Sequence, residues 1–395
     1  MRRSRKKSKS RNSTKYFISL LILLLVPISV YFTLNNLKAN TSTEARIIQN
    51  HEFKKTEQAF RPFTTSMTLG AIGDILIHST VYDDAKTGDG YDFKPMIENV
   101  KGLLESPDLT IANQETIVGG TEIGLSTYPS FNSPYEVADA FKDAGVDIVS
   151  IANNHTLDRG EKAIISATNY LNKIDMEYTG GYQSPEDKNK IRILNRNGIS
   201  IAFLSYTYGT NGIPVPEGKD YLVNLIDMDL IKEDIKAAKQ VADVVTVSMH
   251  WGNEYQLYPN DHQKQLAQEL ADEGVDLIIG HHPHVLQPMD WLTGKDGNQT
   301  FVVYSLGNFL SGQMWDYKDI GGVLQIEIVK EVKAVDETIV RIQNPQFTPT
   351  FVSSSGFRNF KVVPLQNAGQ FGLSNATNKY EEMIHHMNQW LVDRE

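Results

Sequence analysis

Polar side chains that can hold a metal ion recur at the ends of apolar, strand-like segments of this chain. Five such segments end near Asp74, Glu115, Asn154, His250 and His282. In open α/β sheets the carboxyl ends of the strands form the edge at which ligands bind. Neutral imidazole together with carboxylate is the ligand chemistry of Zn, Mn and Fe. The pattern therefore predicts that these strands direct their terminal side chains at one metal site.

Asp74 and Glu115 are the two acids of this pattern. Asp74 follows Gly73, and we expect the glycine to let the backbone turn tightly so that the carboxylate faces the site. The alternative role of Asp74 is a helix N-cap. Glu115, two residues after Asn113, is predicted to hold one cation or to bridge two, with an ordinary capping or surface acid as the alternative. His78 either faces the site or packs against the sheet.

Two amides and an imidazole, Asn153, Asn154 and His155, close the third segment. One amide oxygen can coordinate a metal, and the other amide is expected to fix the loop. The unligated imidazole of His155 is predicted to protonate a leaving group or to stabilise an oxyanion. Asp158 either orients His155 through a hydrogen bond or caps the helix that follows.

The motif His-His-Pro-His at 281–284 is the strongest local indication of metal binding. Pro283 is expected to restrain His282 to extended backbone, which spaces the imidazoles of His282 and His284 for one cation or for two adjacent ones. In an extended segment His281 points to the opposite side, so we expect it to support the ligands instead of binding the metal.

His250 closes another strand, and a lone histidine at such a position is usually structural, but the neighbouring motifs favour a ligand. Asn308, after the last strand of the pattern, is predicted to orient a ligand, to contact substrate or to stabilise its loop. The residues that we expect either to bind the metal or to support its ligands are His78, Asn113, Asn153, Glu254, His281 and Asn308.

Strand-like and helix-like patches alternate from 66 to 351, which predicts an α/β domain with a mainly parallel sheet. Expected strands cover about 67–77, 108–112, 147–152, 199–206, 243–250, 276–280 and 301–306. Expected helices cover about 93–105, 134–144, 161–173, 228–240 and 260–273. The stretches 323–329 and 338–342 predict an antiparallel edge or a second sheet. The C-terminal extension, 352–395, is expected to carry a helix whose His385 and His386 face solvent.

Composition restricts the class of partner. The chain has 395 residues and no cysteine, so every metal ligand must be nitrogen or oxygen. Residues 1–15 carry eight Lys or Arg and no acid, which leaves 30 basic against 48 acidic residues in the remainder. A body this acidic is a poor candidate for nucleic-acid binding, because phosphate contacts need a basic face. An acidic substrate is still compatible, since bound metal ions would dominate the local charge.

An uncharged apolar segment, 16–34, follows the basic residues. At ~1.5 Å per residue it is just long enough to cross a hydrocarbon core of roughly 30 Å. The basic flank places the N-terminus in the cytoplasm and the rest outside, so we predict a single-pass transmembrane anchor in the cell membrane. A cleaved signal peptide is the alternative, although no small-x-small site follows. The polar stretch 35–65 is interpreted as an extracytoplasmic stalk before the domain at 66–351.

The ordered motifs resemble the CapA (PgsA-type) capsule-synthesis family of bacterial poly-γ-glutamate systems, over most of the chain from 66 to about 322. The motifs that carry this resemblance are Gly73-Asp74, Asn113-x-Glu115, Ala152-Asn153-Asn154-His155-x-x-Asp158-x-Gly160, His250-Trp251-Gly252-x-Glu254-Tyr255, Gly280-x-His282-Pro283-His284 and Tyr304-Ser305-Leu306-Gly307-Asn308-Phe309.

That family is similar in turn to calcineurin-like metallophosphoesterases, which implies a layered α/β/β/α sandwich. The similarity implies Asp74 and Asn154 as ligands, Glu115 in the place of a bridging acid, and His155 as the catalytic imidazole. The remaining implied ligands are His250, His282 and His284. The chain departs from the superfamily pattern in two ways: Leu76 stands where a histidine follows the first aspartate, and the bridging acid is Glu115. Either His78 substitutes, or one metal position is weaker or absent.

The resemblance implies an extracytoplasmic protein that serves synthesis, export or attachment of poly-γ-glutamate. Its implied partners are the membrane, the anionic polymer and membrane-embedded synthase subunits. As an enzyme it would be a hydrolase using one or two divalent ions, Mn, Zn or Fe. The alternatives are a non-catalytic assembly or polymer-guiding module and a general surface metallophosphoesterase.

Overall fold

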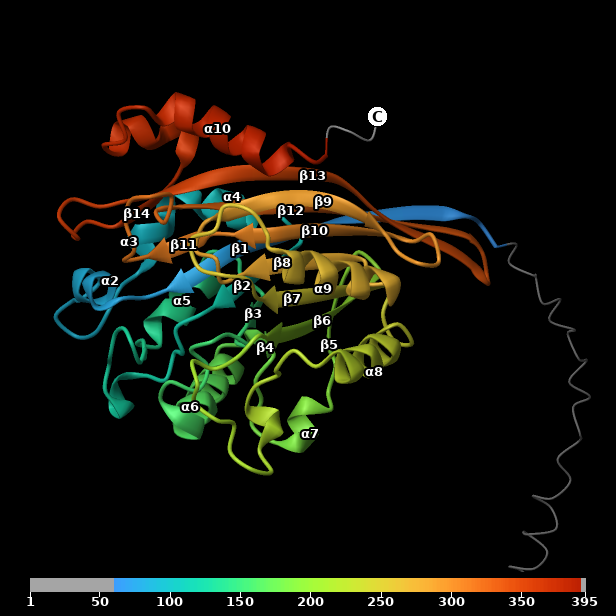
Figure 1. Cartoon of the computed structure of the whole chain (residues 1–395), viewed down its shortest axis with the longest axis horizontal. Helices are drawn as coiled ribbons and strands as arrows, with labels where there is room; N and C mark the ends of the chain where they lie inside the picture. Colours follow the sequence, from blue (N-terminus) through green and yellow to red (C-terminus); the bar gives the residue numbers. More distant parts are fainter. Residues whose placement is uncertain (1–59, 392–395) are drawn as a thin grey trace, which may run out of the picture. The chain divides into compact units, whose positions relative to one another are not determined.

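The structure is a computed structural model that describes residues 60–391. These residues form two β-sheets that pack face to face (Figure 1). Within these residues no helix has the length and hydropathy that a membrane crossing requires. The expected basic tail at 1–15, the anchor at 16–34 and most of the stalk at 35–65 lie outside the described residues, so they remain predictions. The expected end of the stalk at 65 is wrong, because residues 63–65 already belong to the first strand and pair with a neighbouring strand.

The first sheet has eight strands, in the order β14-β13-β12-β1-β2-β3-β4 with β11 paired to β1. Its mutually parallel strands are β1 (Phe63–Leu76), β2 (Leu109–Gln114), β3 (Ile148–Ser150), β4 (Glu177–Thr179) and β11 (Asn308–Ser311). Its antiparallel strands are β12 (Ile320–Ala334), β13 (Glu337–Ser353) and β14 (Lys361–Pro364). β1 joins the two halves, because it pairs in parallel with β2 and antiparallel with β12.

The second sheet has six strands in the order β5-β6-β7-β8-β10-β9. Its parallel centre consists of β6 (Ile199–Thr207), β7 (Val244–His250), β8 (Leu277–His281) and β10 (Gln299–Leu306). Its antiparallel edges are β5 (Arg192–Arg196) and β9 (Leu286–Thr293). The expected parallel strands are thus divided between two mixed sheets.

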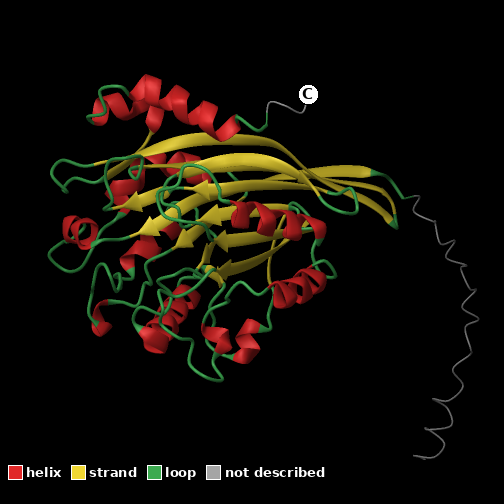
Figure 2. Cartoon of the chain, viewed as in Figure 1, coloured by secondary structure: helices red, strands yellow, loops and turns green. Residues whose placement is uncertain are grey.

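Helices cover the outer faces of both sheets, as the red and yellow layers of Figure 2 show. Those on the first sheet are α3 (Lys94–Ile97), α4 (Lys101–Glu105), α5 (Glu136–Asp143) and α6 (Gly160–Lys173). Those on the second are α8 (Met228–Ala238) and α9 (Asp261–Asp272). The other helices are α2 (Ser79–Asp84), α7 (Pro185–Lys188) and α10 (Ala376–Asn388). Short 3-10 turns cover Glu98–Val100, Thr121–Ile123, Asp220–Leu222 and Leu365–Phe371.

Apolar side chains of the two sheets form one core between them. Leu69, Ile111, Phe203, Ile279 and Leu324 belong to it, and each is at most 1% exposed. Burying a side chain of this size contributes about 1.5–3 kcal/mol relative to leaving it in water. The predicted α/β class is confirmed, and the layers follow the order α/β/β/α.

A β-bulge at Gly73 decides which way Asp74 faces. Ile72 and Ile75 both pack in the outer core beneath the helices, although they lie three positions apart. The register with β2 shifts between Ile72 and Asp74, so the extra residue is accommodated at Gly73. Because successive strand residues alternate between faces, Asp74 lies opposite Ile75 and faces the second sheet.

The prediction of a tight turn at Gly73 is wrong, because this glycine lies within β1, which continues to Leu76. A Cβ at Gly73 would overlap the carbonyl oxygen of Gly307, to which the Asp74 N–H donates a hydrogen bond of 2.8 Å. Glycine is required here because two backbones approach too closely for a side chain.

The C-terminal residues belong to the same layers as the rest of the domain. β13 runs across the expected boundary at 351, and Val363 and Leu365 lie in the core between the sheets. α10 lies along β13 (Figure 1). Among the residues expected to form an extension, β14 thus completes the first sheet, and α10 packs against both β13 of that sheet and β9 of the second.

The expectation that His385 and His386 both face solvent is wrong for His386. This residue is 8% exposed, and its Nε2 lies 3.0 Å from the Leu286 carbonyl oxygen. It precedes Met387 on the face of α10 that also buries Met383. Packing of that apolar stripe therefore takes His386 inward and leaves His385 exposed.

Replacing Gly73 with alanine should lower the free energy of unfolding by about 1–3 kcal/mol, because the methyl group must push β1 away from Gly307. Chemical denaturation measures this difference. Gly88→Ala is the matched control, since nothing lies within 4 Å of a Cβ at Gly88. Equal losses in the two variants would contradict the close-approach explanation.

Candidate metal centre

Buried acids and imidazoles gather where strands of both sheets end. Asp74 lies near the end of β1, Glu115 directly follows β2, and His250 ends β7. His282 and His284 lie in the bend between β8 and β9. All five side chains are at most 3% exposed. The fold thus brings together residues that are widely separated in the sequence.

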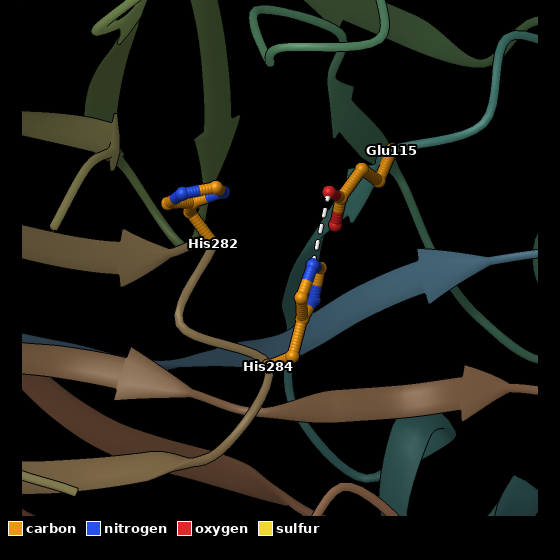
Figure 3. Close-up of side chains that lie close together, drawn as sticks. All are labelled: Glu115, His282 and His284. Carbon is orange, nitrogen blue, oxygen red and sulfur yellow. Dashed lines mark ion pairs between the residues drawn. The ribbon is translucent and has the colours of Figure 1, made fainter. Parts of the chain in front are cut away.

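Ligand atoms of these residues form two overlapping groups. Within each group the atoms lie within 4.8 Å of one another: one comprises Asp74, Glu115 and His250, the other Glu115, His282 and His284. Figure 3 shows the second group, with His284 directed at the carboxylate of Glu115. Glu115 is common to both groups, which is the arrangement that a carboxylate between two adjacent cation positions requires. The nitrogen and oxygen donors suit a divalent transition metal.

Glu115 is a buried acid of the cluster, and neither of its carboxylate oxygens has a hydrogen-bond partner among the described residues. Burial, together with the charges of Asp74 and Glu254, raises the pKa of Glu115 well above its ordinary value. An ionised carboxylate buried without a partner costs several kcal/mol. A bound cation would remove that cost, so the position fits a metal ligand.

His284 is oriented so that one ring nitrogen faces Glu115. The Asn308 Nδ2 donates to the Lys318 carbonyl at 2.8 Å, which leaves Asn308 Oδ1 to face His284 Nδ1 at 3.1 Å. Asp74 Oδ2 lies 3.1 Å from the same nitrogen. Both neighbours are acceptors, so Nδ1 carries the proton and the lone pair of Nε2 points towards Glu115 Oε1, 3.7 Å away. Two electron-rich atoms that face each other in this way fit a cation between them.

Asp74 is well supplied with partners. The Asn113 amide donates to its Oδ1 at 2.8 Å. Burial opposes ionisation, but the neighbouring imidazoles of His281 and His284 outweigh it and hold the pKa of Asp74 well below its ordinary value. Asp74 is therefore the ionised carboxylate of the cluster, in contrast to Glu115.

The expectation that His281 points away from the site is wrong. His281 pairs with His250 across β7 and β8, and paired residues of neighbouring strands face the same side. Its Nδ1 lies 3.4 Å from Asp74 Oδ1, although the geometry is not that of a hydrogen bond. His281 therefore contacts a candidate ligand from within the buried cluster.

The expectation of extended backbone at His282 is also wrong. His282 has a φ of 96° and His284 a φ of 59°, so the chain reverses here instead of continuing as a strand. The His282 N–H lies 3.4 Å from Asp74 Oδ2, and the Pro283 carbonyl accepts a 2.7 Å bond from the Tyr255 N–H. These contacts outweigh the local preference of a residue before proline.

His250 and His282 are held in the neutral form that a ligand needs. Burial, reinforced by His282, lowers the pKa of His250 well below its ordinary value. Burial, reinforced by His284, lowers the pKa of His282 to about 3. Both imidazoles therefore keep a lone pair available near neutral pH.

Asn154 and His155 face different neighbours. Asn154 Oδ1 lies 2.8 Å from His250 Nε2, within the ligand cluster. His155 Nδ1 lies 2.7 Å from Asp158 Oδ2, which also accepts a 2.7 Å bond from the Phe131 N–H. Asp158 thus orients His155 and does not cap α6, whose N-terminus has no side-chain cap.

His155 is further held by an edge-to-face contact with Phe131, with ring centroids 4.7 Å apart. His78 contacts the same ring at 5.1 Å, and its Nδ1 lies 3.1 Å from the Leu76 carbonyl oxygen. Burial is the main cause that lowers the pKa of His78 to about 4. His78 lies outside both ligand groups, so the geometry gives it no place as a substitute ligand.

Two other candidates differ in position. Asn153 Oδ1 accepts from the His155 N–H at 3.0 Å and its Nδ2 donates to the Gln114 carbonyl at 3.0 Å, so it fixes the loop as expected. Glu254 is exposed and lies outside both ligand groups.

Sequence reasoning did not identify Asn211 and Tyr208. Asn211 Oδ1 accepts from Asn154 Nδ2 at 3.3 Å, and its Nδ2 lies 3.4 Å from His155 Nδ1. The Tyr208 ring lies 4.7 Å from that of His282. Both residues belong to a stretch rich in glycine and proline, where asparagine is a common turn residue and gives no separate signal.

The candidate metal ligands lie in a part of the chain that matches a known protein family. Residues 68–313 match the model of a family described as bacterial capsule synthesis protein PGA_cap. The capsule biosynthesis protein CapA of Bacillus anthracis is 29% identical over 306 residues, which cover 74% of this chain and 71% of that protein. The PGA biosynthesis protein CapA of Bacillus subtilis (strain 168) is 34% identical over 197 residues, covering 49% of this chain and 50% of that protein.

Among solved structures, the NAD nucleotidase NadN of Haemophilus influenzae aligns with a TM-score of 0.45 and 14% identity, covering 81% of this chain and 63% of that chain. The family match covers residues 68–313, which include every candidate ligand from Asp74 to His284.

Glu115→Gln should separate metal binding from folding. Without metal the variant should be about as stable as the parent, because the raised pKa leaves Glu115 uncharged and glutamine has nearly the same shape. With Mn²⁺ at 100 times its dissociation constant, the parent should gain about 2.7 kcal/mol and the variant much less. Thermal unfolding with and without Mn²⁺, together with elemental analysis, measures both effects. Exposed Glu337→Gln is the control, and an unchanged Mn²⁺ response of Glu115→Gln would exclude Glu115 as a ligand.

Proposed function

Because this chain belongs to the bacterial capsule synthesis protein family PGA_cap, we propose that it acts in poly-γ-glutamate synthesis as a metal-dependent hydrolase. The main support for hydrolysis is that two consecutive residues, Asn154 and His155, contact different neighbours. Asn154 contacts His250 inside the ligand cluster, whereas His155 contacts Asp158 beside it. A metal ligand and a proton donor are thereby held next to each other by the same loop.

When bound, a divalent cation supplies the positive charge that polarises the scissile group and makes a water molecule more acidic. Hydrolysis adds the hydroxyl of that water to the scissile centre and a proton to the leaving group. His155 Nε2, on the side of the ring away from Asp158, is the atom from which the leaving group takes its proton. Asp158 stabilises the protonated ring and fixes its orientation.

The substrate bond in this proposal is an amide of the polymer or a phosphoester of its precursor. Both present a scissile centre with an oxygen that a cation can polarise, and both leave a group that needs a proton. The resemblance of the motifs to metallophosphoesterases supports the phosphoester, and the names of the two CapA relatives support the polymer.

The proposed location is the outer face of the cell membrane, with the segment at 16–34 as anchor and the domain outside. Support comes from the length of that uncharged segment and the eight basic residues before it. The acidic polymer and membrane-embedded synthase subunits are the proposed partners.

His155→Ala should lower kcat for metal-dependent hydrolysis by about 100-fold or more, because the leaving group loses its proton donor. The full chain is assayed with Mn²⁺ on poly-γ-glutamate, by release of new amino groups, and on p-nitrophenyl phosphate. Metal content should stay unchanged, since the side chain of His155 is not in either ligand group.

His262→Ala, at an exposed histidine of α9, is the control and should keep full activity. Retained hydrolysis in His155→Ala would exclude the proposed proton donor. Absence of hydrolysis in the parent chain, with polymer production in cells unaffected by His155→Ala, would favour a non-catalytic assembly role instead.

Asp158→Asn should lower kcat by about 10-fold or more while the Mn²⁺ content stays constant, because an amide cannot stabilise the protonated ring of His155. The loss should be confined to kcat and leave KM nearly unchanged. Exposed Asp220→Asn serves as the control. An unchanged kcat in Asp158→Asn would show that this pair has no part in catalysis.

A further inference from the structure

A strained turn borders the candidate metal centre. This rim turn, residues 313–319, connects β11 to β12. Its central residues Trp315, Asp316 and Tyr317 have φ values of 64°, 51° and 68°, a conformation that non-glycine residues adopt rarely and almost never three in a row. Such a conformation persists only where surrounding contacts impose it, and it is typical of ligand-binding segments.

The contacts that impose it come from the turn and from the metal centre. The Lys318 N–H donates to the Trp315 carbonyl at 3.0 Å. The Asn308 amide donates to the Lys318 carbonyl at 2.8 Å and to Gln313 Oε1 at 3.1 Å. Because Asn308 Oδ1 also holds His284, the rim turn is fixed in position relative to a candidate metal ligand.

The rim turn places a cation and a hydroxyl group beside the site. Lys318 Nζ lies 5.3 Å from the centre of the Tyr255 ring, which is 6.1 Å from the ring of His284. The Tyr255 hydroxyl accepts from Gln313 Nε2 at 3.3 Å. Burial, followed by the charge of Glu254 and a side-chain hydrogen bond with it, raises the pKa of Tyr255 to about 12, so the hydroxyl stays protonated.

The charge of Lys318 is only weakly engaged within the chain. Its Nζ lies 3.3 Å from Asp316 Oδ2, and the side chain of Asp316 is 87% exposed. An ion pair with so exposed a partner is strongly screened by water. Glu254, outside both ligand groups, is an exposed acid beside Tyr255 that would repel an anionic chain. A cation at the rim offsets that repulsion.

We propose that the rim turn is a recognition subsite for one carboxylate of an anionic chain, which pairs with Lys318 Nζ and accepts a hydrogen bond from Tyr255. This inference rests on the proposed function, because the anionic polymer bound at the rim turn is the substrate, and the bond next to its bound carboxylate is the one hydrolysed at the metal centre. Lys318 and Tyr255 set which anionic chain is accepted and in which register, and His155 performs the proton transfer.

Lys318→Gln should weaken binding of a γ-linked glutamate oligomer to the full chain by about 5-fold at low salt. The difference should disappear near 1 M salt, where the Debye length falls to about 3 Å. Binding is measured by calorimetry with saturating Mn²⁺ in the His155→Ala background, so that no hydrolysis interferes. The same oligomer with its carboxylates amidated should bind equally to both proteins.

Lys188→Gln is the matched control, because Lys188 makes a similar pair, 3.1 Å from an Asp220 side chain that is 83% exposed. Equal oligomer affinity in Lys318→Gln and the control would overturn the subsite, even where the parent chain hydrolyses its substrate. A Lys318-dependent affinity in a chain that hydrolyses nothing would support the subsite and count against the proposed enzyme. Weakened binding of inorganic phosphate in Lys318→Gln, with the oligomer unaffected, would overturn the carboxylate assignment.

Discussion

The structure depends on two buried carboxylates that share one cluster of imidazoles but differ in their partners. Asp74 receives hydrogen bonds from Asn113 and His284 and stays ionised. Glu115 has no donor at all among the described residues, although it lies between His250 and His284. A low-dielectric site can hold this second charge only with a compensating cation. The paired sheets, the bulge in β1 and the bend after β8 are the features that position these groups.

Much of the fold could be predicted from local patterns. Each strand and helix expected within the described residues has a counterpart, because hydrophobic periodicity is a local property and the central strands are buried on both faces. The resemblance implied two β layers, but which strand belongs to which sheet could not be predicted, since strand order depends on contacts between distant segments. β4 is too short to show a pattern, and β9 contains a proline, which argues against a strand.

The site was predictable in composition but not in geometry. Strand-end histidines and acids identify Asp74, Glu115, His250, His282 and His284 without any tertiary information. The directions of His281 and His282 could not be predicted, because tertiary contacts impose a reversal that the local sequence disfavours. Asn211 and Lys318 were missed for a related reason: an amide in a turn and a surface lysine acquire significance only from what lies beside them.

The antiparallel pairing of β1 with β12 has a consequence for biosynthesis. β1 is made early, yet its hydrogen bonds along one edge, from Phe63 to Ile72, are completed only by residues 323–332. A nascent chain therefore exposes an apolar strand edge until most of the domain has been synthesised, and such edges invite mispairing with other chains. Contacts this distant in sequence also slow folding. Truncation before β12 would thus remove more than the last strands, because it would leave the first one without its neighbour and prone to aggregate.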